Sequence, residues 1–169
     1  MFRAPEGVEQ KLGVEEHLAM GRWWGEIGND WDSHPKMLHK DVRRLSNDPA
    51  EGEVGAGADG WHIDGYSSKN PYLLNIMHFW EASEGGETWI SPLKELVEGL
   101  DAETRALWED LWFLTGDGKG KEFLHPLICK NSITGDPSMI FHCGAYKCWG
   151  LYRTEEKDKD EADRKMIDF

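Results

Sequence analysis

The apolar run YLLNIMHFWEA at residues 72–82 constrains the fold more than any other feature of this sequence. It lies between Pro71 and the turn-forming stretch SEGGE, and it is rich in aromatic residues, which is typical of a buried strand. It is also much shorter than the roughly 18–20 apolar residues that a membrane helix needs. We therefore expect a sheet rather than a membrane span, with this run inside it.

The remaining segments predict helices and further short strands around that run. By apolar periodicity and capping residues we expect helices over residues 14–27, 91–100 and 101–112, and a charged helical tail over 154–169. We expect strands over residues 37–45, 88–90, 125–132 and 133–144, the last two joined by a turn at TGDP. Ser91, Asp101 and Thr154 are the expected helix caps. This order predicts a mixed α/β fold with a mainly antiparallel sheet and helices packed on one side.

Composition limits the class of protein. The 169 residues suit one domain with a core of its own. The formal net charge of −13 argues against binding to nucleic acid, which depends on basic patches. The N-terminal MFRAPEGVEQ does not resemble a secretory signal, and three cysteines, an odd number, suit a reducing compartment. We expect a soluble cytoplasmic protein.

The stretch WHIDGY places His62 and Asp64 two residues apart. In an extended strand, residues i and i+2 point to the same face, so an imidazole and a carboxylate would converge there. Together with one histidine from elsewhere, such a pair is how a facial triad holds Fe(II). The alternative is a surface turn that makes only local hydrogen bonds.

Two other motifs suggest different chemistry. The glycines at residues 55–60 match G-x-G-x-x-G, but no strand precedes them and no helix follows, so we do not expect a dinucleotide site. His142, Cys143 and Cys148 are candidates for a zinc site, although structural zinc normally needs a second pair of ligands. Ordinary buried thiols are the alternative.

Taken together, four motifs resemble one family. W-H-x-D-G at 61–65, G-G-E-T-W at 85–89, H-P-L at 125–127 and T-G-x-x-x-x-x-F at 134–141 are similar to the TauD/TfdA-like oxygenases. The resemblance spans residues 14–153. It implies a double-stranded β-helix (jelly roll), Fe(II) as cofactor, 2-oxoglutarate and O2 as co-substrates, and hydroxylation of a small organic substrate.

The same resemblance implies roles for individual residues. His62 and Asp64 would be the first two iron ligands, and Thr88 would contact 2-oxoglutarate. Thr88 follows two glycines, which let a backbone pass close to a ligand, and its hydroxyl can bond a carboxylate. His34 would contact the substrate, or it is a solvent-exposed loop histidine, and Trp61 and Tyr66 would line the substrate site or simply pack. His125 is expected to have a structural role at the start of a strand.

The sequence departs from the family downstream. There the family has a third histidine ligand and an arginine that binds 2-oxoglutarate, whereas this sequence has no histidine after His142 and only Arg164 after Thr154. Either His142 takes the place of the third ligand or it is a packed residue. We expect an incomplete single domain. The alternative to an enzyme is a truncated, non-catalytic fragment or binding module, completed by a second copy or by another chain, because unpaired strand edges invite association.

Overall fold

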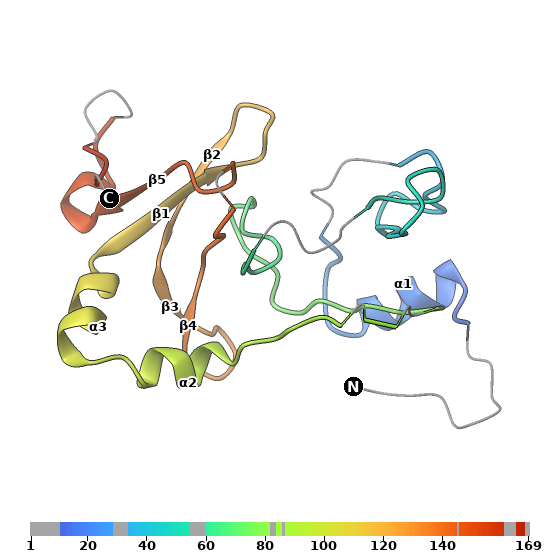
Figure 1. Cartoon of the computed structure of the whole chain (residues 1–169), viewed down its shortest axis with the longest axis horizontal. Helices are drawn as coiled ribbons and strands as arrows, with labels where there is room; N and C mark the ends of the chain where they lie inside the picture. The colour runs from blue at the N-terminus through green and yellow to red at the C-terminus, as the bar shows by residue number, and fades with distance from the viewer. Residues whose placement is uncertain are drawn as a thin grey trace. The chain divides into compact units, whose positions relative to one another are not determined.

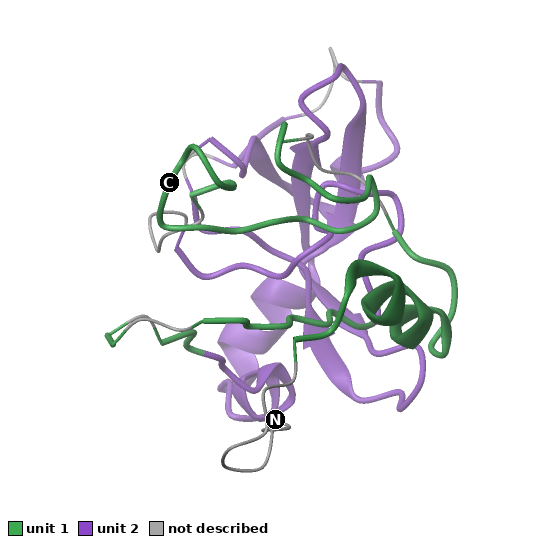
Figure 2. Cartoon of the chain, turned by 90° about the vertical axis from the view of Figure 1, so that its right-hand side faces the viewer, with its two compact units in different colours: residues 1–55, 74–89 green, residues 56–73, 90–169 purple. Residues whose placement is uncertain are grey.

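The computed structural model describes residues 11–28, 34–54, 60–81, 84–85, 87–144, 146–160 and 165–167. The chain divides into two compact units (Figure 2). Unit 1 comprises residues 1–55 and 74–89, and unit 2 comprises residues 56–73 and 90–169. Most of the glycine motif, residues 55–59, lies outside the described residues. The single incomplete domain stays a prediction.

Unit 2 contains two antiparallel sheets (Figure 1). In the larger one, β1 (Leu111–Gly116) pairs on one side with β2 (Glu122–Pro126) and on the other with β5 (Gly150–Arg153). The smaller sheet is the hairpin of β3 (Ile128–Lys130) and β4 (Pro137–Met139). The predicted mixed α/β fold with antiparallel sheets is confirmed, and neither sheet closes into a barrel in the described residues.

The core of unit 2 lies between two helices and these strands. The helices are α2 (Leu93–Glu98) and α3 (Ala102–Glu109). The buried cluster joins side chains from α2, β1, β4 and the residue between β2 and β3: Val97, Leu111, Met139 and Leu127. As predicted, Asp101 caps α3, accepting a hydrogen bond from the Thr104 backbone N–H at 2.9 Å. Ser91 is not the cap of α2, because Pro92 occupies that position.

The third predicted helix ends earlier than its periodicity suggests. Leu111 and Trp112, expected on the helix, instead begin β1, the central strand. Asp110 ends α3 and binds Arg153 of β5, with 2.9 Å between Oδ2 and Nη1. The segment LWFLTG then pairs with a strand on each side, and this pairing outweighs the helical pattern of its first two residues.

Unit 1 differs most from expectation. Its helix α1 (Val14–Arg22) confirms the first part of the helix predicted over 14–27 and buries Leu18. The helix ends five residues early, and Trp23 and Trp24, which follow it, are exposed. The run at 72–82 forms no strand over its described residues, and Phe79 within it is exposed. Residues 88–90 form no strand either. An apolar pattern favours a strand, but a strand forms only where a neighbouring backbone provides a ladder.

Shorter segments also depart from the predictions. In place of a strand over 37–45, two isolated bridges join His39 to Val42 and Leu45 to Glu53. β2 begins at Glu122, before the strand predicted over 125–132, and β5 lies where no strand was expected.

In the tail, the described residues form only a 3-10 helix over Thr154–Glu156 instead of the predicted longer helix. Thr154 is the first residue of this helix and not its cap, which is Arg153. The Thr154 hydroxyl donates instead to the Asp110 carbonyl at 3.2 Å. Among the described residues we find no helix with the length and apolarity required to cross a bilayer.

The central strand provides a test of the core. Phe113 in β1 is 1% exposed and Phe79 is 61% exposed. We expect Phe113→Ala to lower the free energy of unfolding by about 3–5 kcal/mol, because it removes a buried ring and leaves a cavity. The matched change Phe79→Ala should stay within about 0.5 kcal/mol of the parent. Urea denaturation of both variants measures this, and equal losses would contradict the burial described.

Candidate functional site

His62 and Asp64 lie together in unit 2, with His62 Nε2 3.4 Å from Asp64 Oδ1. The other ring nitrogen, Nδ1, lies 2.9 Å from the Gly60 carbonyl oxygen. A carbonyl can only accept, so Nδ1 carries the proton of the neutral ring and Nε2 carries the lone pair. The lone-pair nitrogen is therefore the one beside the carboxylate, as a metal-binding pair requires.

A second His-x-Asp pair in the chain has a different arrangement of its ring nitrogens. His39 and Asp41 have the same spacing, and His39 Nδ1 lies 3.7 Å from Asp41 Oδ2. That same nitrogen accepts a hydrogen bond from the Asp41 backbone N–H at 3.2 Å. Because the nitrogen that faces the carboxylate is already engaged, this pair lacks the arrangement found at His62.

The backbone around His62 is held by an antiparallel bridge to His142. The Ile63 N–H donates to the Phe141 carbonyl at 3.2 Å, and the Cys143 N–H donates to the Trp61 carbonyl at 2.9 Å. These bonds flank the two histidines, which makes them a non-hydrogen-bonded pair, the kind in which facing side chains are closest. Accordingly, the two imidazole rings stack, with centroids 4.8 Å apart and planes at 14°.

His142 is the most enclosed member of this cluster, with 4% of its surface exposed. Its Nδ1 accepts a hydrogen bond from the Gly144 N–H at 2.9 Å, so in the neutral ring Nε2 carries the proton. The Tyr66 ring meets it edge to face at 4.5 Å between centroids. The aromatic group thus comprises His62, His142 and Tyr66.

The loop that carries His62 is also bonded to strand β2. His125 of β2 donates from Nε2 to the Tyr66 carbonyl at 3.0 Å. Burial lowers the pKa of His125 below its ordinary value, although the hydrogen bond to the Tyr66 carbonyl opposes that shift. Gly65 has φ +77°, and a Cβ there would lie 2.7 Å from the Tyr72 nitrogen, so only glycine fits this turn. The sequence predicted a structural role for His125, and this bond is consistent with it.

Two ligands at right angles on one divalent metal, with bonds of about 2.1 Å, lie about 3.0 Å apart. The separation of His62 Nε2 and Asp64 Oδ1 is close to that spacing, so the pair fits two positions around a metal. The described residues contain no group of three or more His, Cys, Asp or Glu arranged to hold one. That result gives no support to the zinc alternative from His142, Cys143 and Cys148, nor to His142 as the third ligand.

The other predicted site residues are distributed over both units. Trp61 lies in unit 2 beside His62, with its indole exposed. Thr88 and His34 belong to unit 1. Thr88 is exposed, whereas the half-buried His34 ring lies with Nε2 3.1 Å from the Pro49 carbonyl oxygen. Within unit 2 the structure therefore brings together His62, Asp64, Tyr66 and Trp61.

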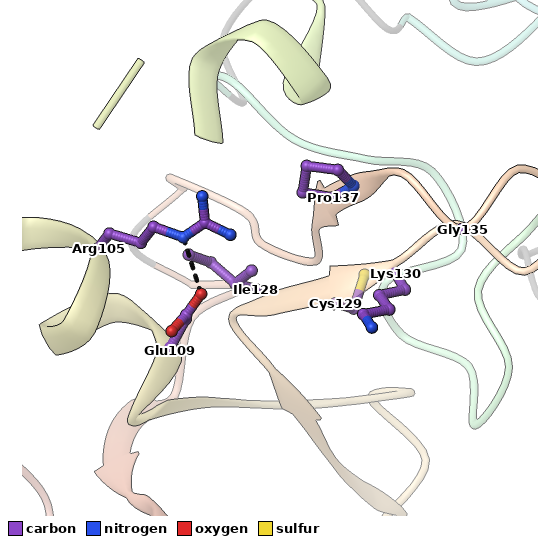
Figure 3. A pocket seen from close by; sticks show the side chains of 7 residues that line it. All are labelled: Arg105, Glu109, Ile128, Cys129, Lys130, Gly135 and Pro137. Atoms are coloured by element: carbon purple, nitrogen blue, oxygen red, sulfur yellow. Dashed lines mark hydrogen bonds and ion pairs between the residues drawn. The ribbon is translucent and has the colours of Figure 1, made fainter. Parts of the chain in front are cut away.

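A hollow of about 250 Å³ elsewhere in unit 2 offers less chemistry (Figure 3). Arg105 and Glu109 of α3 face each other across part of it and form an ion pair at 2.9 Å. Cys129 of β3 also lines the hollow, and burial raises the pKa of its thiol, which keeps the thiol protonated and weakly nucleophilic. Among the residues that line the hollow, no nucleophile is hydrogen-bonded to a base, so we do not regard the hollow as a reaction site.

The sequence pointed to the His62–Asp64 pair and named His142 as a third ligand or a packed residue, but it did not indicate that the His142 ring stacks on His62. His142 lies 80 residues from His62, and only antiparallel pairing brings the two rings together. The available signal was the short apolar strand before His142, which marked a segment able to pair with WHID.

The family model described as "Taurine catabolism dioxygenase TauD, TfdA family" matches residues 7–162. No curated protein and no solved structure matches the chain.

The buried His125 predicts a dependence of stability on pH. Its lowered pKa means that the unfolded chain takes up a proton below about pH 6.5 while the folded chain does not. The free energy of unfolding should therefore fall as pH drops from about 6.5 towards the folded pKa. His125→Gln keeps a donor for the Tyr66 carbonyl but does not titrate, so it should flatten this slope. Urea midpoints between about pH 5.5 and 7.5 measure it, and an unchanged slope in the variant would contradict the assignment.

Proposed function

The chain belongs to the taurine catabolism dioxygenase family (TauD, TfdA), and from this membership we propose that it is an Fe(II)- and 2-oxoglutarate-dependent dioxygenase. The family gives the general class, a dioxygenase. The dependence on Fe(II) and 2-oxoglutarate, and a small organic molecule as substrate, are our proposal. We also propose that the two open sheets are part of a jelly roll, and that the protein acts in the cytoplasm, where its cysteines stay reduced.

One observation carries the proposal: the lone-pair nitrogen of His62 faces Asp64 at 3.4 Å, with the opposite nitrogen bonded to Gly60. Imidazole and carboxylate are ligands that suit Fe(II), and two of them on one side leave positions for co-substrate and oxygen. The Gly60 carbonyl favours the tautomer that is protonated at Nδ1 before any metal binds.

In this proposal each predicted site residue has its own role. His62 and Asp64 hold the iron, and Thr88 donates its hydroxyl to a carboxylate of 2-oxoglutarate. Trp61 and Tyr66 line the substrate side, and His34 contacts the substrate. Iron held here would supply the oxidation of the substrate by O2, and the chain's residues would bind, orient and shield the reactants.

A second candidate is a binding module without turnover. It is favoured by the finding that the described residues hold no three-ligand group. In this case another chain, or a second copy of this one, would supply the remaining ligand. The exposed apolar side chains of Leu74, Met77 and Phe79 offer a surface for such an association.

Anaerobic titration with Fe(II) and 2-oxoglutarate tests the two candidates. We expect a visible charge-transfer band from the parent chain, and its loss in His62→Ala and in Asp64→Ala, because each removes a ligand. His39→Ala is the matched control, since it alters the other His-x-Asp pair, and it should leave the band unchanged.

Consumption of O2 in the absence of substrate, measured after air is admitted to the same mixture, separates an enzyme from a binding module. A band without O2 consumption would favour the module. A folded parent chain that gives no band at any concentration of iron would refute the dioxygenase proposal.

A further inference from the structure

We propose that His142 is a positioning residue, whose imidazole face holds the His62 ring in the orientation that directs Nε2 at Asp64. The inference rests on the proposed function, because it assigns His142 a role towards the same metal pair. It concerns a side chain that the sequence offered only as a metal ligand or as a packed residue.

The pairing of the two backbones brings the His62 and His142 rings together. His62 and His142 face each other as a non-hydrogen-bonded pair, fixed by the flanking bonds from Ile63 to Phe141 and from Cys143 to Trp61. In this kind of pair the Cα atoms are only about 4.5 Å apart, so facing side chains must pack. The backbone bridge therefore places the two rings next to each other.

The His142 ring is itself held on two sides. The Gly144 N–H bonds its Nδ1 at 2.9 Å, and the Tyr66 ring packs edge to face against it. At 4% exposure it has little freedom to turn, whereas the His62 side chain is 37% exposed. The buried ring thus provides a fixed platform on which the more exposed ring lies flat.

The His142 ring is oriented to position His62 and not to bind the metal itself. With Nδ1 accepting from Gly144, the neutral His142 ring has its proton on Nε2 and offers no lone pair to a metal. Two rings stacked at 14° also point their nitrogens side by side rather than at one point. The absence of a three-ligand group among the described residues agrees with both observations.

A platform of this kind acts by preorganisation. Without it, the half-exposed His62 ring would sample other rotamers, and metal binding would have to select the productive one. Partners that orient a metal-binding histidine typically change metal affinity by about 10–100-fold when they are removed. We expect a loss in that range when the face of His142 is removed.

Two variants of the whole chain divide the possible roles of His142. His142→Phe keeps an aromatic face for His62 but lacks an acceptor for Gly144. His142→Asn keeps an acceptor but lacks the face. Binding of Mn(II) is measured by electron paramagnetic resonance of the free ion, with His62→Ala as reference. Positioning predicts that His142→Phe binds within about 3-fold of the parent, and that His142→Asn binds about 10–100-fold more weakly.

Other patterns overturn the inference. If His142→Asn binds normally and His142→Phe does not, the bond to Gly144 matters and the ring face does not. If both bind as weakly as His62→Ala, His142 is a ligand. If neither changes affinity, His142 has no role in metal binding.

A measurement without metal keeps the inference separate from the proposed function. Nitrogen-15 spectra of the imidazoles report tautomer and ring averaging in the free chain. Positioning predicts one His62 tautomer, protonated at Nδ1, in the parent and in His142→Phe, and averaged signals in His142→Asn. If the parent binds no Mn(II), the proposed function fails, and these spectra alone decide the role of His142. Identical His62 signals in all three proteins would overturn the positioning role of His142.

Discussion

The burial of strand β1, with a partner strand on each edge, is the constraint on which unit 2 depends. Its residues 113–115 are almost completely enclosed, and β2 and β5 take up its backbone groups on both sides. The buried Thr115 hydroxyl donates to the Lys147 carbonyl at 2.9 Å, and the Trp149 N–H donates to the Leu114 carbonyl at 2.9 Å. A central strand satisfied in this way fixes the segments bonded to it.

The candidate site is attached to that strand by two routes. One runs through β2, where His125 bonds the carbonyl of Tyr66 in the loop that carries His62 and Asp64. The other runs through residues 147–149, which follow closely on His142 and are bonded to β1. The two stacked histidines are therefore held from separate segments that share one anchor. Such a site can keep its ligand geometry in the absence of metal, which is the condition for preorganised binding.

The sequence was informative where local physical chemistry decides the outcome. Asp101 caps α3 because a carboxylate next to free N–H groups is stabilising in almost any context. The turn between β3 and β4 forms where TGDP predicted it. It was misleading where pairing decides. The run at 72–82 has the composition of a strand but no ladder among the described residues, whereas Leu111 and Trp112 have a helical pattern but are paired on both sides.

By itself the sequence predicted that a histidine and a carboxylate two residues apart would face the same way, because alternation along an extended backbone requires only neighbouring residues. It also determined the family, through motifs that are local in the chain. Only the tertiary structure decided that His142 lies flat against the His62 ring. This contact joins residues 80 apart in the chain, and it is set by the pairing of the two backbones and by burial rather than by local pattern.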